Sequence, residues 1–373
     1  MSKKIHFISN DVGSLGEITN DLINYLKNYF IVTNEAENQI PKKFDILVSH
    51  FISEKVTLSS HFNSFRFRVL IQPIDGTKLK KNIIDSINRY DLIITPGKAG
   101  KKIMINNGVY KPIKVIPNYY KPEILSPVKN LSIPELDKLI NDKFVFYHES
   151  TCHPRKGIKA LCESFTRAFS SNTEHFPVVL LIKSSPHNEY TFDDLEKIKK
   201  DIIKLQKEYK YPAQIIKISQ HLPFKTLEKI WHKIDAYVSF AGIEGFGIPL
   251  LRMALLEKPI VTLKSEISGY MDYLNNNSNT IFVNSVRGKA EKELTVIYES
   301  ETEWEYPTSI EECKTALLET YFSPHNVNDF SREFLKKYSY KYIMEEYKNL
   351  FYNIEKYKIR NSSYSFIESD IEI

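Results

Sequence analysis

Long apolar runs are missing from this sequence of 373 residues. No stretch approaches the roughly 18 consecutive apolar residues that a membrane-spanning helix requires. The first residues, Met-Ser-Lys-Lys-Ile-His-Phe, lack the long apolar core of a secretory signal peptide. We therefore expect a cytoplasmic protein, and a peripheral contact with a membrane is compatible with that expectation.

Cysteine is also scarce. Cys152, Cys162 and Cys313 cannot all pair with one another, and no Cys-x-x-Cys motif occurs. Reduced thiols are therefore expected. The histidines show no paired spacing typical of zinc ligands, and the sequence contains no Asp-x-Asp motif that would hold a metal through carboxylates. We expect a site without a metal.

Neither sign of charge is in large excess. Lysine and arginine number 51 against 46 aspartates and glutamates, and the resulting net charge of +5 is too small to indicate nucleic-acid binding. The chain is long enough for two domains, each able to bury its own core, and its 42% hydrophobic content is typical of soluble globular proteins. Composition therefore does not indicate a function, which has to be inferred from the sequence motifs.

Short apolar, β-branched runs alternate with stretches of helical period, which is typical of βα units and a parallel sheet. A polar stretch with three prolines, residues 121–142, interrupts this pattern and predicts a linker. We expect two doubly wound α/β domains, residues 1–120 and 143–330, facing across a cleft. The expected strands are Ile5–Ile8, Asp45–Val48, Val69–Ile71, Leu92–Thr95 and Val115–Ile116 in the first domain, and Phe144–Tyr147, Val178–Ile182, Ile215–Ile218, Ala236–Ser239, Ile260–Leu263 and Thr280–Val283 in the second. The expected helices of the first domain include Glu17–Tyr29 and Gly97–Asn107.

The last regular segment is residues 331–360, where apolar side chains recur at helical spacing. Two placements stay open. The helix packs back on the first domain, or it is an amphipathic helix on its own domain. The polar tail, residues 361–373, is expected to fray.

One segment carries most of the functional information: residues 244–251 have the sequence Glu-Gly-Phe-Gly-Ile-Pro-Leu-Leu, with an apolar strand on each side. Pro249 suits the first turn of a helix. A helix start presents unpaired N–H groups and the positive end of the macrodipole, which favour phosphate, and Gly245 and Gly247 let a ligand approach the backbone. Glu244 can accept hydrogen bonds from two hydroxyls. Phosphate beside a polyol is what a nucleotide sugar presents.

This segment resembles the donor-site signature of the retaining GT-B glycosyltransferases of family 4 ("glycosyl transferases group 1"), Glu-Gly-Phe-Gly-Leu-Pro-Leu-Leu-Glu-Ala. The resemblance implies two Rossmann-like domains with a C-terminal crossover helix. It implies transfer of a sugar, with retention of configuration and without a cofactor, from a UDP- or GDP-linked donor to an acceptor hydroxyl, such as that of a glycan or a lipid-linked glycan. By the same resemblance Glu244 holds sugar hydroxyls, and the amides of Phe246, Gly247 and Ile248 lie near sugar or phosphate.

The second glutamate of that signature is replaced by Arg252. Arginine has five donors and no acceptor, so it cannot accept hydrogen bonds from ribose hydroxyls as the family's glutamate does. Position 252 lies within about one helical turn of Pro249, where a cation could meet a phosphate or pair with Glu244. Three interpretations stay open: another residue holds the ribose, the donor is unusual, or transfer has been lost and the fold kept.

A second cluster, Arg155-Lys156-Gly157, follows a predicted strand and opens a helix. Ligands of doubly wound folds bind at the carboxyl ends of strands, and two cations there could neutralise a departing diphosphate. The family carries a Gly-Arg pair and then Lys-Gly at this place. Lys156 and Gly157 match the latter, whereas the arginine is expected at Ser150, and Arg155 is its possible substitute. A solvated helix start is the alternative for both cations.

Three further residues are candidates. Gly13 and Gly16 follow the first strand, where the family has a glycine-rich loop facing the sugar and diphosphate; a simple tight turn is the alternative. Their spacing is not the three-glycine dinucleotide fingerprint. His50 follows another predicted strand, at a place where some family members have a histidine near the acceptor. It could take a proton from an acceptor hydroxyl near neutral pH, or it could have no chemical role.

Two other classes of function stay open beside a glycosyltransferase. A non-catalytic GT-B subunit that binds a nucleotide sugar or a protein partner is suggested by Arg252 and Ser150. An epimerase of nucleotide sugars with the same architecture is the third interpretation, and the match of residues 244–249 to the glycosyltransferase signature argues against it.

Overall fold

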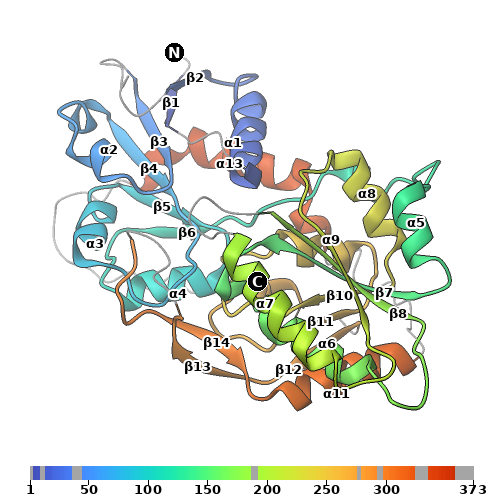
Figure 1. Cartoon of the computed structure of the whole chain (residues 1–373). Coiled ribbons are helices and arrows are strands. Elements are labelled where there is room, and N and C mark those ends of the chain that lie inside the picture. Colours follow the sequence, from blue (N-terminus) through green and yellow to red (C-terminus); the bar gives the residue numbers. More distant parts are fainter. Residues whose placement is uncertain are drawn as a thin grey trace.

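The structure is a computed structural model, and it describes residues 3–8, 13–35, 44–185, 192–274, 279–291, 297–323 and 335–357. Two six-stranded parallel sheets form the centres of two α/β domains, and helices cover their faces (Figure 1). The predicted fold class is therefore confirmed. The described helices, strands and short 3-10 turns (η) follow by domain.

The first sheet has the strand order β2-β1-β3-β4-β5-β6. Its strands β3 and β5 are buried along their whole length because helices lie on both faces of the sheet. The strand β2 was not predicted, and the first helix begins four residues before the predicted one. The elements are β1 (Lys4–Ile8), α1 (Gly13–Leu26), β2 (Ile31–Glu35), β3 (Ile46–His50), α2 (Glu54–Leu58), η1 (Phe62–Ser64), β4 (Phe67–Ile71), α3 (Lys81–Ile87), β5 (Leu92–Thr95), α4 (Lys98–Asn106) and β6 (Ile113–Val115).

The second sheet has the order β12-β11-β10-β7-β8-β9. Its strands β10, β11 and β12 coincide with the predicted ones at both ends, and β7 and β8 extend beyond their predicted ends. The elements are η2 (Pro122–Leu125), α5 (Pro134–Ile140), β7 (Phe144–Thr151), η3 (Pro154–Lys156), α6 (Ile158–Phe169), β8 (Val178–Ser185), α7 (Phe192–Gln206), β9 (Gln214–Ile218), α8 (Phe224–Lys233), β10 (Ala236–Ser239), α9 (Ile248–Leu255), β11 (Ile260–Leu263), α10 (Met271–Leu274), β12 (Thr280–Val283) and α11 (Ile310–Phe322).

Each sheet has one point where the order of strand addition reverses. It lies between β1 and β3 in the first sheet and between β7 and β10 in the second. At such a point two crossover connections diverge and leave a crevice at the carboxyl ends of the strands, which is where doubly wound folds bind ligands. His50 ends β3, and Glu149 to Thr151 end β7. The fold therefore favours a ligand beside these residues.

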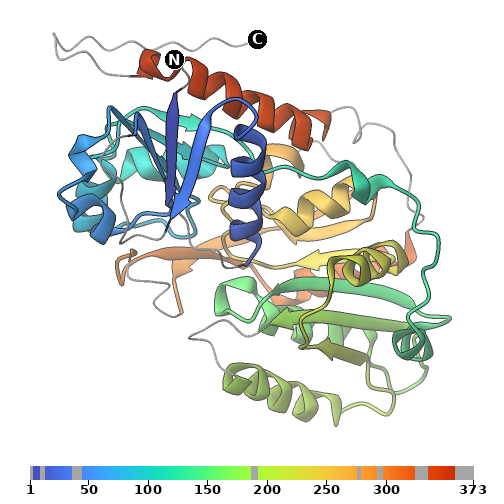
Figure 2. The same ribbon diagram turned by 90° about the horizontal axis from the view of Figure 1, so that it is seen from above.

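The helix α13 (Tyr340–Tyr352) returns from the second domain and packs on the first. Ile343, Tyr347 and Phe351 are buried in the same cluster as Phe7 and Leu22 of the first domain, and Figure 2 shows the helix, in red, lying across that domain. Of the two placements left open, the crossover helix is therefore the observed one. The structure begins this helix at 340, with η4 (Lys336–Tyr338) before it and η5 (Ile354–Tyr357) after it; residues 331–334 and 358–373 lie outside the described part.

The two connections between the domains are hydrogen-bonded to each other. Tyr120, in the first connection, bridges Ser339 in the second. The Tyr120 amide donates to the Tyr338 carbonyl at 2.9 Å, and the Tyr340 amide donates to the Tyr120 carbonyl at 2.9 Å. The domains are therefore tied at the point where the chain crosses between them.

A two-stranded antiparallel hairpin of the second domain, β13 (Ser285–Lys289) and β14 (Glu303–Pro307), was not predicted. It reaches toward the first domain (Figure 1). Tyr298, between its strands, bridges Leu79 and is buried in a core cluster of the first domain together with Trp304. Apolar packing therefore joins the two domains beside the cleft.

Candidate functional site

Lys156 and Glu244 form a largely buried ion pair. Lys156 ends η3 after β7, and Glu244 lies in the loop between β10 and α9. The Lys156 Nζ is 2.5 Å from Glu244 Oε1, and the two side chains are 11% and 16% exposed. The structure thus brings the two principal candidate residues together beside the switch point of the second sheet.

Arg155 lies on the other side of the same carboxylate. Its Nη1 is 3.5 Å from Glu244 Oε2 and donates a hydrogen bond of 2.8 Å to the carbonyl of Ile243. Its Nη2 donates to Asp75 Oδ2 at 3.1 Å. Two cations therefore flank Glu244, and one of them also holds a carboxylate of the first domain.

This arrangement shifts the pKa values of all three groups. Burial raises the pKa of Glu244, but the neighbouring Lys156 and Arg155 outweigh it, so that the net pKa is lowered. Burial, and next the charge of Arg155, lower the pKa of Lys156 although Glu244 opposes them. Burial lowers the pKa of Arg155, but Asp75 and Glu244 raise it further. Glu244 is therefore an ionised acceptor at neutral pH.

Two glycines fix the backbone around the pair. Gly157 has φ +68°, and a Cβ there would lie 2.1 Å from the carbonyl oxygen of Phe240, so the turn that presents Lys156 requires glycine. Gly247 has φ +82° and ψ +56° and caps α9, whose first turn contains Pro249. These conformations explain why glycine occupies both positions.

Hydrogen bonds to its carbonyls fix the loop between β10 and α9, and three of its amides can donate to a ligand. The Tyr273 hydroxyl donates to the carbonyls of Phe246 and Gly247 at 2.9 and 2.6 Å, and the Glu244 amide donates to Ser268 Oγ at 3.1 Å. Within the described residues the amides of Phe246, Gly247 and Ile248 meet no hydrogen-bond acceptor. Such amides at a helix start are suited to an anion.

Asp75, from the first domain, completes the site and was not predicted. It follows β4, its Oδ1 accepts a 2.8 Å hydrogen bond from the Gly245 amide, and its own amide donates to the Tyr298 hydroxyl at 2.7 Å. An aspartate after a buried strand in the turn Pro-Ile-Asp-Gly was the available signal. Nothing in the sequence indicated that its partner lies in the other domain.

His50 lies at the carboxyl end of β3, at the switch point of the first sheet. Its Nδ1 is hydrogen-bonded to Thr19 Oγ1 of α1, and its ring stacks on Phe51 with centroids 4.8 Å apart. Burial lowers the pKa of His50 to about 4, so the imidazole is neutral at pH 7. No contact among the described residues joins it to Lys156 or Glu244.

Gly13 and Gly16 both lie inside α1, which begins at Gly13. The two glycines therefore begin the helix and do not form a loop before it, and their contact with the donor stays a prediction. The preceding residues, 9–12, lie outside the described part of the chain.

Arg252 does not pair with Glu244, one of the two contacts considered for it. Its guanidinium carbon lies 4.7 Å from the ring centroid of Trp231 on α8, and Glu244 instead takes Lys156 and Arg155 as its cations. Ser150 stands where the family has an arginine, and its Oγ is 2.8 Å from His148 Nε2.

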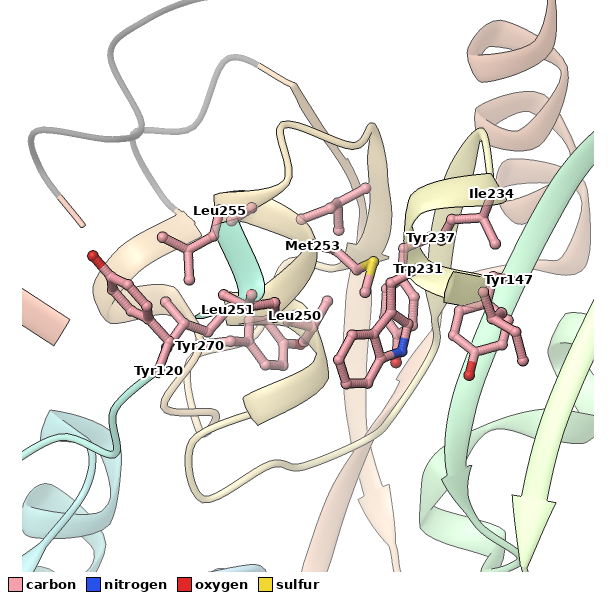
Figure 3. Close-up of a cluster of buried hydrophobic side chains, with 14 of the residues drawn as sticks. Tyr120, Tyr147, Trp231, Ile234, Tyr237, Leu250, Leu251, Met253, Leu255 and Tyr270 are labelled. Atoms are coloured by element: carbon pink, nitrogen blue, oxygen red, sulfur yellow. The ribbon is translucent and has the colours of Figure 1, made fainter. Parts of the chain in front are cut away.

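Glu149, on β7, lies on the other side of Trp231 and was also missed. Its Oε2 accepts hydrogen bonds from Trp231 Nε1 at 2.8 Å and from the Tyr147 hydroxyl at 3.0 Å. Figure 3 shows Trp231 between the side chains of α9 and Tyr147. A glutamate near the end of a strand was the only signal in the sequence.

The described residues contain no group of three or more histidine, cysteine, aspartate or glutamate side chains that could hold a metal ion. Cys152, Cys162 and Cys313 are buried thiols that form no disulfide within the described part of the chain, as expected. None of the described helices has the length and apolar character needed to cross a membrane.

Comparison with known proteins finds no matching family model and no curated protein with significant similarity. Solved structures share the fold. An E. coli trehalose-6-phosphate structure bound with UDP-2-fluoro glucose has TM-score 0.68 and 11% identity, covering 96% of this chain and 99% of that one. Sucrose-phosphate synthase from Thermosynechococcus elongatus has TM-score 0.69 and 11% identity, with coverages of 95% and 99%. The lipopolysaccharide outer core galactosyltransferase WaaB has TM-score 0.59 and 14% identity, with coverages of 94% and 99%. At such identities the likeness shows the fold, which is the GT-B architecture.

Proposed function

We propose that this protein is a retaining glycosyltransferase that takes its sugar from a UDP- or GDP-linked donor. The observation that carries the proposal is the Lys156–Glu244 pair beside the unpaired amides of Phe246 to Ile248. Cations and amides suit a diphosphate, and an ionised carboxylate suits sugar hydroxyls. The resemblance of residues 244–251 to the family signature, and a fold shared with solved glycosyltransferases, support the same function.

The residues of the site have separate roles in the proposed reaction. Negative charge grows on the diphosphate as its bond to the sugar breaks, and Lys156 with Arg155 stabilises that charge. Two side-chain cations supply the neutralisation that a metal provides elsewhere, so the proposed reaction uses no metal. Glu244 holds the sugar through its hydroxyls. The acceptor, which we propose to be a glycan, enters from the first domain, where the neutral imidazole of His50 can accept a proton.

Donor binding requires the present contacts to rearrange. Both oxygens of Glu244 face cations, and Asp75 occupies the Gly245 amide and Arg155. A diphosphate competes with these carboxylates for the same cations, and sugar hydroxyls take the place of a cation at Glu244. A small opening of the two domains before binding, and closure after it, would allow this exchange and would exclude water from the donor.

The second candidate is a GT-B subunit that binds a nucleotide without transferring a sugar. Arg252 and Ser150 favour it, because both depart from the family's donor site. The two functions differ in turnover and share the binding of nucleotide.

The test incubates the full chain with UDP- and GDP-sugars and measures both thermal stabilisation and release of the nucleoside diphosphate. We expect one nucleotide class to stabilise the protein and its sugar to be slowly hydrolysed. Release should fall in Lys156→Ala and Glu244→Gln and persist in the control Lys159→Ala, an exposed lysine three residues away on α6. Stabilisation without turnover, even with mixtures of glycan acceptors, would favour the binding subunit. Normal binding and turnover in Glu244→Ala would contradict the assigned site.

A further inference from the structure

Three side chains from three elements form a second group next to the proposed diphosphate site. They are Glu149 on β7, Trp231 on α8 and Arg252 on α9. The Trp231 indole donates from its edge to Glu149 Oε2 at 2.8 Å, and its face lies 4.7 Å from the Arg252 guanidinium carbon. The indole therefore separates a carboxylate from a cation and holds both in place.

Glu149 has acceptor capacity that the protein does not use. Its Oε2 accepts from Trp231 and from the Tyr147 hydroxyl. Across the described ranges no donor reaches Oε1, and no cation pairs with this half-buried carboxylate. An ionised carboxylate offers about four acceptor positions on two oxygens. Oε1 is therefore left to accept hydrogen bonds from hydroxyl groups of a ligand.

The position of this group fits one particular part of the proposed donor. Arg252 is four residues along α9 from Ile248, a rise of about 6 Å from the helix start. The buried hydroxyl of Tyr237 lies among the charges of Glu149, Glu244 and Arg252: its pKa is raised by burial and then by the two glutamates, and Arg252 acts in the opposite direction. A nucleoside attached to a diphosphate at the helix start would extend over this group.

Aromatic surface lies at the same place. Phe224, at the start of α8, is 40% exposed and packs edge-on against Trp231, with ring centroids 5.5 Å apart. Phe224, Ile248 and Arg252 line a cavity of about 40 Å³ that also reaches Tyr120. An apolar surface next to a carboxylate and a cation is the chemistry that recognises a nucleoside, whose base is flat and whose ribose carries two hydroxyls.

We infer that Glu149 holds the ribose hydroxyls of the donor nucleotide, with Trp231 fixing its carboxylate and Arg252 donating to the nucleotide from the opposite face of the indole. The inference rests on the proposed nucleotide-sugar function. It places on β7 the acceptor that position 252 cannot supply. Glu149 is thus a binding residue that distinguishes ribose from sugars lacking these hydroxyls, and Trp231 is the residue that positions it.

The experiment compares two ligands in two proteins by calorimetric titration of the full chain. The ligands are the nucleoside diphosphate that stabilises the protein and its 2′,3′-dideoxy counterpart, and the proteins are the native chain and Glu149→Gln. We expect the native chain to bind the ribonucleotide about tenfold to a hundredfold more tightly than the dideoxy form, the range that one or two hydrogen bonds to a charged group give. Glu149→Gln should lose most of that ratio and bind the dideoxy form as before.

A merely structural role for Glu149 gives a different pattern. If the carboxylate only orients Trp231, Glu149→Gln weakens both ligands equally, and the inference is overturned. Trp231→Phe serves as the control, because it removes the indole donor and leaves both charges. Because Glu149 stays in place but loses one of its two hydrogen-bond donors, Trp231→Phe should reduce the preference for ribose less than Glu149→Gln does.

A rescue experiment tests the relocated carboxylate directly. Glu149→Ala should abolish the preference for the ribonucleotide, and the double variant Glu149→Ala with Arg252→Glu should restore at least part of it, because a carboxylate then returns one turn into α9. Absence of rescue together with equal loss for both ligands would contradict the inference. A native chain that binds and turns over a donor without preferring ribose refutes this inference alone, whereas a native chain that binds no nucleotide refutes the proposed function as well.

Discussion

Asp75 and Gly245, from different domains, are joined by one hydrogen bond: the Gly245 amide donates to Asp75 Oδ1 at 2.8 Å. The second oxygen of Asp75 accepts from Arg155 Nη2 at 3.1 Å. The Asp75 side chain, from the first domain, thus occupies a backbone N–H group and the guanidinium of Arg155. Both groups belong to the proposed site for the nucleotide sugar. Any anion that uses these two groups has to displace a carboxylate, which makes the first domain a competitor of the ligand.

Replacing Asp75 by asparagine should therefore have two opposite effects. The free energy of unfolding should fall by about 1–3 kcal/mol, because a hydrogen bond to a charged group between the domains is weakened. The affinity for nucleoside diphosphate should rise, because Arg155 is released from its carboxylate. Urea unfolding and calorimetric titration measure the two effects. Asp85→Asn, on the exposed face of α3, is the matched control and should change neither. Weaker nucleotide binding in Asp75→Asn would instead make Asp75 part of the ligand site.

Glu244 should make the stability of the protein depend on pH in the acid range. Its folded-state pKa is lowered, so its contribution is fully present above the unfolded-state pKa of about 4.3 and is lost as pH falls through the folded value. At pH 7, Glu244→Gln should cost about 3–5 kcal/mol, because Lys156 and Arg155 lose a largely buried partner. Urea unfolding of both proteins between pH 7 and pH 3 should show the difference shrinking with acidity. A difference that stays constant over this range would contradict the lowered pKa of Glu244.

The strands that form because their apolar side chains are buried could be predicted from the sequence. The strands β2 and β13, which do not depend on such burial, were missed. The strands β10 to β12 are short runs rich in β-branched and aromatic residues, and their ends were predicted correctly. The edge strand β2, Ile-Val-Thr-Asn-Glu, has only two apolar residues, and Ile31 is 49% exposed. The hairpin strand β13, Ser-Val-Arg-Gly-Lys, is held by its partner β14 and not by an apolar face. Both β2 and β13 are defined by their pairing with a neighbouring strand, and no local sequence pattern encodes that pairing.

The candidate site divides in the same way. Lys156 and Glu244 could be selected because each lies in a motif with a recognisable local conformation, a glycine turn that opens a helix. Asp75 and Glu149 have no such motif. Asp75 contacts a residue 170 positions away, and Glu149 matters because Trp231, 82 positions away, orients it. Their partners are set by how the elements pack, so the sequence could offer only an acidic residue near the end of a strand.

His50 should titrate far from the ordinary range of histidine. Burial lowers its folded-state pKa to about 4, whereas the unfolded chain takes up the proton near pH 6.5. Because the folded value is the lower one, stability is lost as pH falls between about 6.5 and about 4, and His50→Asn should remove that part of the loss. If His50 accepts the proton of the acceptor hydroxyl, the acid limb that it adds to the profile of kcat/KM should lie near pH 4. NMR titration of the imidazole, assigned with His50→Asn, measures the value, and a pKa near 6.5 would contradict the burial argument.

Gly157 should tolerate alanine less well than another glycine with a similar backbone. Gly157 and Gly108 both have positive φ, +68° and +91°, so alanine costs about 1–2 kcal/mol at either position from backbone strain alone. A Cβ at Gly108 meets nothing within 4 Å, whereas at Gly157 it would lie 2.1 Å from the Phe240 carbonyl oxygen. Because that atom belongs to the backbone that follows β10, it can move only with the strand and the loop to Glu244. Gly157→Ala should therefore lose more unfolding free energy than Gly108→Ala in urea and should also lose donor hydrolysis, since Lys156 precedes the displaced turn. Equal losses of stability in the two variants would show that the turn can shift without disturbing the ion pair.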